Sequence, residues 1–321
     1  MEPKSTNAPL KATVVVPVFN EENVISIFLE TIEELFKARP DIQLEILFVN
    51  DGSTDATLAR LIELQDMGHQ IRIIDLGRNF GKEAALAAGL HHATGQVVIP
   101  IDVDLQDDPK LIFDMIEKWR EGYEVVLGRR IDRSTDTRLK RVTANAFYYV
   151  HNLISQPKIS SNVGDFRLMD RKVVEAFRSL PESRRFSKGL FAWVGFRSTY
   201  VDYSRTPRVA GCSKFNGWKL WNFALEGFTS FSTAPLRFWT YFGLGISLTS
   251  FLYALLIITK VLIRGIDVPG YASLIVAIMF FGGLQLMGIG ILGEYLGRTY
   301  IESKRRPIFI VREAIEPSKN A

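Results

Sequence analysis

Short, almost uninterrupted apolar runs alternate with segments of helical periodicity over the first 128 residues of the chain. The runs ATVVVPVF, LEILFVND, IRIIDLG, QVVIPIDVD and YEVVLG are rich in Val, Ile and Leu, which is typical of strands buried on both faces. Between them the pattern predicts helices over 21–37, 55–66, 81–93 and 109–121. This alternation indicates βαβ units, so we expect an α/β domain with a Rossmann-like, mostly parallel sheet.

Two much longer apolar segments follow, at about 236–263 and 271–296. Each is long enough to cross a hydrocarbon core of about 30 Å, which needs roughly 20 apolar residues, so they predict two transmembrane helices. The connector RGIDVPG is short, and the two spans should therefore form a hairpin. The basic segment GRTYIESKRRP after the second span favours the cytoplasmic side.

Residues 129–235 differ from both of these parts because basic residues are interleaved with aromatic ones. The stretches RRIDRSTDTRLKRVTANAFYYVHNLI and KFNGWKLWNFALEGFTSFST can form amphipathic helices that lie in a membrane interface. The pattern alone fits two helices packed on a soluble domain equally well. The two predicted spans that follow favour the membrane interface. We therefore expect four parts: a core at 1–128, a region with interfacial amphipathic helices at 129–235, a transmembrane hairpin at 236–300 and a cytoplasmic tail at 301–321.

Composition and charge narrow the classes of partner. The net charge of +4 and the pI near 9.0 are mild and no long Arg or Lys arm is present, which argues against nucleic acid. The single cysteine, Cys212, makes no internal disulfide and no zinc cluster, which suits a reducing cytosol. The start, MEPKSTNAPLKA, lacks the apolar core of a secretory signal. We therefore predict a multi-pass protein of the cell membrane with its first domain and both termini in the cytoplasm.

Polar clusters follow four of the predicted strands: PVFNEE, VNDGSTD, GRNFGKE and DVDLQDD. Ligands of open parallel sheets bind beyond the carboxyl ends of the strands, so these clusters predict a binding site on one rim. Hard cations such as Mg²⁺ or Mn²⁺ prefer oxygen ligands and often share them with substrate phosphates. Asp104 and the amide oxygen of Gln106 could hold such a cation, which leaves Asp102 for the sugar of a nucleotide.

Other phosphate and metal sites fit the sequence poorly. No GxGxxG follows the first strand, and GRNFGK has the wrong spacing for a P-loop. The four histidines lack the i, i+4 spacing of a helical metal pair. Dehydrogenases, P-loop enzymes and helical zinc sites are therefore disfavoured.

The ordered series VVVPVFNEE, VNDGSTD, GRNFGKEAAL, DVDLQDDP, GDFRLMDR and GCSKF resembles the family 2 glycosyltransferases of the polyprenyl-phosphate type. With two spans ending in GEYLGR, the chain is most similar to the bactoprenol glucosyltransferases. This resemblance covers nearly the whole chain. It implies a GT-A catalytic fold, UDP-glucose as donor, Mg²⁺ or Mn²⁺, undecaprenyl phosphate as membrane acceptor, and a homotetramer.

The resemblance also implies roles for individual residues. Those expected around the nucleotide sugar are Pro17, Val18, Asn20, Glu22, Asp51, Asn79, Lys82, Asp102 and Arg208. Those expected at the metal are Asp104 and Gln106, and those at the acceptor phosphate are Arg129, Arg141 and Lys214. The two expected to act in catalysis are Asp165, at the position of the family's candidate base, and Asp102, which assists the donor.

The expected reaction is an inverting transfer in which Lys82 or Arg208, with the metal, offsets the charge of the leaving diphosphate. The acceptor, a phosphate monoester with a second pKa near 6, is already mostly ionised at neutral pH. Asp165 could therefore orient the acceptor or counter Arg167 instead of removing a proton.

Three alternatives stay open at the level of the sequence. A dolichyl-phosphate mannose synthase-like enzyme or an aminosugar transferase would carry the same base and metal motifs. A processive polysaccharide synthase is less compatible, since QxxRW is absent. A membrane scaffold or flippase subunit would bind nucleotide without catalysis, although two helices offer a sugar headgroup little pathway.

Overall fold

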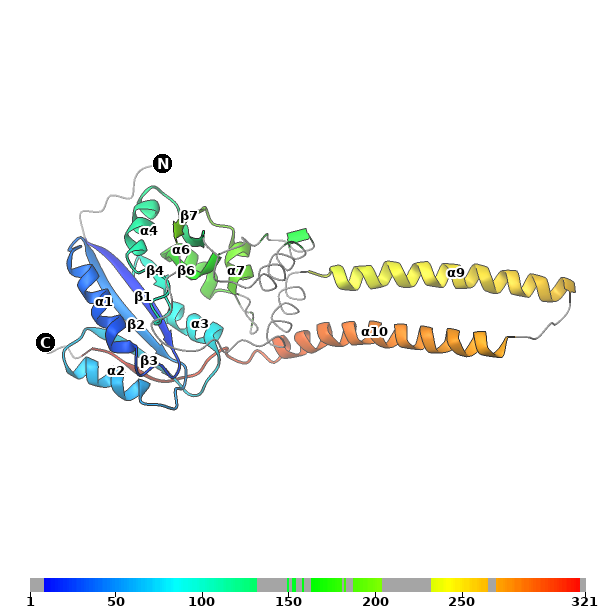
Figure 1. The fold of residues 1–321 in the computed structure, drawn as a ribbon, viewed down its shortest axis with the longest axis horizontal. Helices are drawn as coiled ribbons and strands as arrows, with labels where there is room; N and C mark the ends of the chain where they lie inside the picture. Colours follow the sequence, from blue (N-terminus) through cyan, green and yellow to red (C-terminus); the bar gives the residue numbers. More distant parts are fainter. Residues whose placement is uncertain are drawn as a thin grey trace.

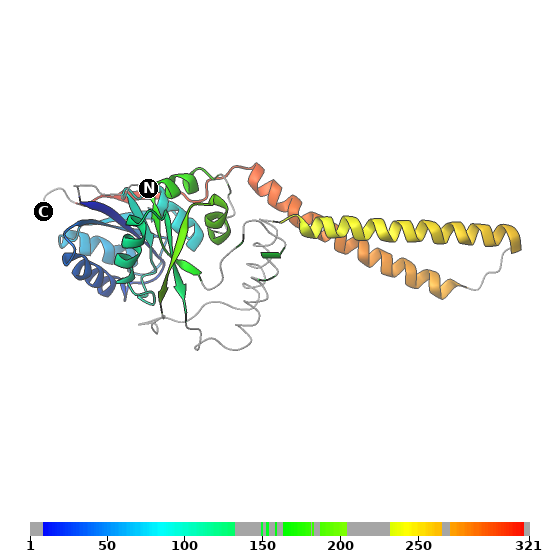
Figure 2. The same cartoon turned by 90° about the horizontal axis from the view of Figure 1, so that it is seen from above.

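The computed structural model describes residues 9–131, 149, 152–153, 158, 163–180, 182, 187–203, 232–264 and 270–317. These residues form an α/β domain from which two long helices project in the same direction (Figure 1, Figure 2). The strands are β1 Leu10–Val18, β2 Ile42–Asn50, β3 Ile71–Leu76, β4 Val97–Pro100, β5 Val125–Arg130, β6 Val163–Asp170, β7 Ser198–Tyr203 and β8 Val311–Ile315. The helices are α1 Ile25–Lys37, α2 Thr57–Asp66, α3 Lys82–His92, α4 Leu111–Arg120, α6 Arg171–Arg178, α7 Ser187–Val194, α9 Ala234–Arg264 and α10 Tyr271–Ser303.

All eight strands belong to one sheet, in the order β7-β5-β6-β4-β1-β2-β3-β8. The pairs β1–β2, β1–β4, β2–β3 and β5–β7 are parallel, whereas β3–β8, β4–β6 and β5–β6 are antiparallel. The prediction of an α/β domain is confirmed, but the sheet is mixed. It is mixed because β6 and β8, which enter from later parts of the chain, run against their neighbours.

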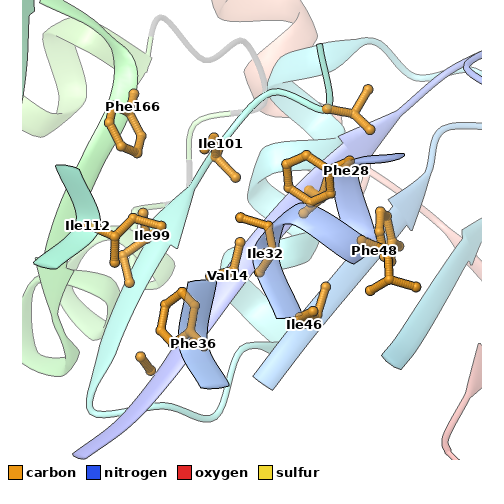
Figure 3. Close-up of a cluster of buried hydrophobic side chains, with 14 of the residues drawn as sticks. Val14, Phe28, Ile32, Phe36, Ile46, Phe48, Ile99, Ile101, Ile112 and Phe166 are labelled. Carbon is orange, nitrogen blue, oxygen red and sulfur yellow. The ribbon is translucent and has the colours of Figure 1, made fainter. Parts of the chain in front are cut away.

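Helices cover both faces of the sheet, and the strand residues alternate between two apolar cores. Val14 and Val16 of β1 pack with α1, α2 and α4, where the buried side chains include Phe28 and Phe48 (Figure 3). Val15, between them, packs on the other face with α3, α6 and α7. This two-sided burial explains why the strands read as continuous apolar runs.

The sheet extends beyond the parts of the chain in which strands were predicted. The expected boundary at residue 128 falls inside β5, and β6 and β7 lie after it. The expected tail at 301–321 contains β8, whose Ile315 pairs with Ile73 of β3. β8 is a short edge strand with three exposed residues out of five, so it lacks the long apolar run of the central strands.

The two long helices agree in position with the two apolar segments of the sequence. Among the described residues, one segment, Ser273–Ser303 of α10, has the length and mean hydropathy, 2.2, needed to cross a membrane. α9 spans 31 residues and exposes large apolar side chains such as Phe251. The indole of Trp239 on α9 lies against Gly288 on α10, where a methyl group would come within 2.0 Å of its Nε1.

Candidate active site

A cavity of about 290 Å³ lies at the carboxyl ends of β1, β2 and β4, beside the N-terminus of α3. Its lining residues are Pro17, Val18, Phe19, Glu21, Asp51, Asn79, Gly81, Lys82, Ala85, Asp102, Val103 and Asp104. All of them except Ala85 belong to the four polar clusters that follow the predicted strands, and every cluster contributes. The structure therefore brings together Pro17, Val18, Asp51, Asn79, Lys82, Asp102 and Asp104 of the predicted site.

Lys82, the first residue of α3, lies between two carboxylates. Its Nζ is 2.7 Å from Asp102 Oδ1 and 2.9 Å from Asp165 Oδ2. Burial works to lower the pKa of Lys82, but the charges of Asp165 and Asp102 outweigh it and hold this pKa above its ordinary value. Lys82 therefore stays protonated at neutral pH, and it joins Asp165 to the wall of the cavity although Asp165 is not among the lining residues.

Asp51, which is 3% exposed, fixes the loop before α3. Its carboxylate accepts the backbone N–H groups of Phe80 at 2.8 Å and of Gly81 at 2.9 Å. Burial raises the pKa of Asp51, while these two hydrogen bonds oppose that shift. The neighbouring Gly52 has a φ of +64°, and a methyl group there would come within 2.3 Å of the Arg78 carbonyl carbon. Only glycine therefore permits this close approach of the two loops.

Asn20 and Glu22 do not line the cavity. Asn20 Oδ1 accepts the backbone N–H of Thr54 at 2.8 Å, and Glu22 Oε2 accepts that of Ala56 at 2.9 Å. Both side chains thus join the loop after β1 to the loop after β2, and their predicted contact with a nucleotide stays a prediction.

Gln106 is also absent from the cavity lining: it is buried, and its backbone N–H donates to Asp104 Oδ1 at 3.2 Å. Asp107, the next residue, contacts side chains from two strands of the sheet. The hydroxyl of Tyr203 donates to Asp107 Oδ1 at 2.5 Å, and Arg130 lies 3.6 Å away. Burial, reinforced by Asp107, raises the pKa of Tyr203 to about 12.

Residues 13–178 match the family described as glycosyl transferase family 2. The chain belongs to this family. The bactoprenol glucosyl transferase of Shigella phage SfV is 56% identical over 303 residues, covering 94% of this chain and 98% of that protein. The prophage bactoprenol glucosyl transferase homolog of Escherichia coli K12 is 54% identical, covering 94% of this chain and 99% of that protein.

The family membership confirms the resemblance seen in the sequence motifs. Among solved structures, the glucosyl-3-phosphoglycerate synthase of Mycobacterium tuberculosis with Mn²⁺, UDP-glucose and phosphoglyceric acid is 18% identical, with a TM-score of 0.48. That similarity covers 67% of this chain and 76% of that chain. The Mn²⁺ and the nucleotide sugar are ligands of that protein.

The basic residues predicted for this family 2 glycosyltransferase are only partly described. Arg129 donates to both carboxylate oxygens of Asp202 on β7, at 2.6 and 2.7 Å, and its guanidinium lies 4.9 Å from the centre of the Tyr200 ring. Arg208 of the nucleotide-sugar set, and Arg141 and Lys214 of the acceptor set, lie outside the described residues.

The oxygen donors of the cavity suit a metal that is shared with a substrate. Among the described residues, no group of three or more His, Cys, Asp or Glu side chains is close enough to hold a metal ion alone. Asp102 and Asp104 both line the cavity, and Asp102 is also paired with Lys82. Mg²⁺ is commonly bound through one or two carboxylates together with substrate phosphates, and this donor set fits that pattern.

Behind Lys82 lies a buried polar cluster that our sequence analysis did not assign to the site. Ser187 donates a hydrogen bond to Glu83, and burial, with the charge of Asp165, raises the pKa of Glu83 to about 7. Arg167 is 2% exposed, donates to the backbone oxygen of Gly164 at 2.8 Å, and has its pKa lowered to about 10 by burial. One feature of the sequence could have indicated this cluster. Arg167 lies within the buried strand β6, and a buried positive charge needs acids nearby.

Proposed function

We propose that this glycosyltransferase transfers glucose from UDP-glucose to undecaprenyl phosphate at the cytoplasmic surface of a membrane, with inversion at the anomeric carbon. The observation that carries the proposal is the 56% identity to a bactoprenol glucosyl transferase over 94% of this chain. The cavity supports it, since it collects seven of the predicted site residues at the carboxyl edge of the sheet.

The donor end of the cavity is suited to a diphosphate. Gly81 and Lys82, at the start of α3, line the cavity, and the N-terminus of a helix favours anions through its free N–H groups and its dipole. Lys82 stays protonated, so it can offset the negative charge that develops on the departing UDP. Asp102 holds the Lys82 ammonium in place and, in this proposal, also contacts the donor sugar.

We assign Asp104 and Gln106 to a divalent metal, Mg²⁺ or Mn²⁺. When bound, the metal would supply positive charge at the diphosphate. The position of Asp104 in the lining of the cavity supports this assignment. Gln106 lies two residues further along the same loop, and its backbone N–H donates to the Asp104 carboxylate.

The acceptor explains the long helices. Removing a polyprenyl chain from a bilayer costs about 0.8 kcal/mol per CH₂ group, so the enzyme must work at the membrane surface. We propose that α9 and α10 form a two-span hairpin, which the contact of Trp239 with Gly288 supports. In this arrangement residues 129–235 face the acceptor, with Arg129, Arg141 and Lys214 near its phosphate, and a homotetramer stays a prediction.

Asp165 is expected to hold Lys82 in position and to orient the acceptor. We predict that Asp165→Asn lowers turnover about 10-fold to 100-fold, in the range of an electrostatic contribution to catalysis. The affinity for UDP should stay within about twofold of the wild type, because the remaining pair of Lys82 with Asp102 still holds the ammonium in place. Turnover of the purified variant and UDP titration by calorimetry measure the two quantities. Near-normal turnover would remove Asp165 from the catalytic residues.

The direct test of the function is transfer of label to an organic-soluble lipid by the purified protein. With undecaprenyl phosphate present, labelled UDP-glucose should give a lipid product with inverted configuration. GDP-mannose and UDP-N-acetylglucosamine should give far less. Preference for either of these donors would favour the mannose synthase-like or aminosugar alternative, and absence of transfer with every donor would favour a scaffold or flippase subunit.

The same assay tests the metal. Complete chelation with EDTA should abolish transfer, and added Mg²⁺ or Mn²⁺ should restore it, because the cavity acids, Asp104 among them, would otherwise meet the diphosphate without a metal between them. A control with the Ca²⁺-selective chelator EGTA in excess Mg²⁺ should retain activity. Transfer that survives complete chelation would contradict the assignment of Asp104 and Gln106.

A further inference from the structure

A second and larger cavity, of about 730 Å³, lies where α10 meets the α/β domain. The residues that line it come from the C-terminal half of α3, the end of α6 and the segment after α10. Both Lys82 and His91 belong to α3, and the step of nine positions from one to the other corresponds to about 14 Å along the helix axis. The cavity is therefore separate from the proposed donor site, and the proposed function makes no use of it.

Arginines outnumber acids in the lining of this cavity. Arg178, Arg305 and Arg306 line it, and none of the three forms an ion pair with a carboxylate of the described residues. Glu182 and Glu302 line it as well, but each of them already has an interaction of its own. The three guanidinium groups are thus available to an anion from outside the chain.

The electrostatic effect of these arginines extends to a neighbouring side chain. His91 also lines the cavity, and its ring centre lies 6.1 Å from that of Phe309. Burial lowers the pKa of His91, and the positive charge of Arg178 lowers it further. Arg178 is thus close enough to His91 for its charge to act on the ring, in addition to the larger effect of burial.

The backbone conformation of Arg305 is a second, independent observation in favour of an anion site at this cavity. Arg305 has a φ of +47° directly after the last residues of α10, and its N–H donates to the Glu302 carbonyl at 3.1 Å. A helix that ends in this left-handed conformation usually has glycine there, because a side chain adds steric cost. An arginine at this position keeps a guanidinium on the cavity wall at the expense of backbone strain, which is typical of a functional position.

The position of the cavity indicates the source of the anion. The candidate membrane segment ends at Ser303, and Arg305 and Arg306 follow within one helical turn. Basic groups just beyond the cytoplasmic end of a span meet the phosphates of anionic lipids. Ile308 and Phe309 add an apolar wall beside the arginines, which suits a ligand that also carries hydrocarbon.

We propose that this junction cavity binds the headgroup phosphate of an anionic phospholipid, held by Arg178, Arg305 and Arg306. The proposal depends on α10 crossing the membrane, and it does not depend on the identity of the sugar or of the acceptor. A bound lipid would join α6 of the catalytic domain to the end of α10 and so set the domain against the bilayer.

The test is retention of lipid by the purified full-length protein in detergent, measured by mass spectrometry after addition of phosphatidylglycerol or phosphatidylcholine. The wild type should retain phosphatidylglycerol preferentially. The double substitution R178Q/R305Q should weaken this retention about 10-fold or more, because each basic group contributes separately to the attraction. The control Lys118→Gln removes a cation that is paired with Glu121 on the exposed side of α4, and it should retain lipid as the wild type does. Equal retention by the double variant and the wild type would overturn the proposal.

Two further arms decide the source of the phosphate and guard against misfolding. Displacement of phosphatidylglycerol by millimolar inorganic phosphate, but not by chloride of equal ionic strength, would assign the cavity to a free phosphate ion and overturn the lipid assignment. Arg305→Gly removes the strain at φ +47°, so it should raise Tm while it weakens lipid retention. Unchanged retention in this variant would also count against the proposal. Because retention is measured without any transfer, its failure leaves the proposed function unaffected.

Discussion

Lys82→Gln is expected to lower glucosyl transfer by about 10²-fold to 10³-fold, the usual effect of removing one preorganised electrostatic group from an active site. Lys82 is the cation of the cavity that bridges Asp102 and Asp165, at 2.7 and 2.9 Å. Without it, these two carboxylates lose the charge that joins them, and the departing UDP loses a positive neighbour. Steady-state kinetics with UDP-glucose and undecaprenyl phosphate measure the effect, which should appear mainly in kcat.

Two variants make this result specific. Lys82→Arg keeps the positive charge and should recover part of the activity, although a planar guanidinium does not fit the position of an ammonium between two acids. Lys118→Gln, which removes an exposed lysine paired with Glu121, should change transfer by less than about twofold. Activity of Lys82→Gln within about threefold of the wild type would contradict the role of Lys82 in stabilising the leaving group.

Gly52→Ala is expected to destabilise the α/β domain by about 3 kcal/mol, since it combines an unfavourable backbone conformation with a steric clash. The new methyl group would lie 2.3 Å from the carbonyl carbon of Arg78 and 2.5 Å from the nitrogen of Asn79. The loop at 78–81 would have to move, and with it the hydrogen bonds that Asp51 accepts from Phe80 and Gly81. The affinity for UDP should fall together with the stability.

A thermal unfolding scan measures the first effect, and we expect Tm to fall by about 6–12 °C. Gly68→Ala is the matched control: Gly68 also has a positive φ, +100°, but a methyl group there would meet no atom within 4 Å. The control should show only the conformational cost and leave UDP binding unchanged. Equal decreases in Tm for the two variants would mean that the close approach of the two loops is not what Gly52 provides.

The first half of the chain could be predicted because its elements depend on local patterns. Buried parallel strands need apolar residues on both faces, so β1, β2 and β3 appear in the sequence as apolar runs that end within about two residues of the observed positions. The polar clusters after these strands meet at one edge because parallel strands share a direction. That geometric necessity made Asp51, Lys82, Asp102 and Asp104 predictable as neighbours.

Other contacts of the site depend on partners that are far away in the sequence. Asp165 reaches Lys82 only because β6 inserts antiparallel between β4 and β5, a pairing for which no local pattern exists. Asn20 was expected at the nucleotide, but its side chain holds the backbone of Thr54 in the next loop. Glu83 lies in the first turn of α3, where exposed acids are common, so its sequence position does not indicate burial. Only the packing of α7 buries it against Ser187.

The sequence by itself determined the family, the alternating α/β pattern, the two long apolar segments and the acids and lysine that gather at one rim of the sheet. These features follow from local periodicity and from the shared direction of parallel strands. The tertiary structure alone decided the mixed sheet, the addition of β8 from the last residues, the pairing of Lys82 with Asp165 and the basic cavity at the end of α10. Each of these joins segments separated by tens to hundreds of residues, and their energies depend on burial and charge at contacts that exist only once the chain has folded.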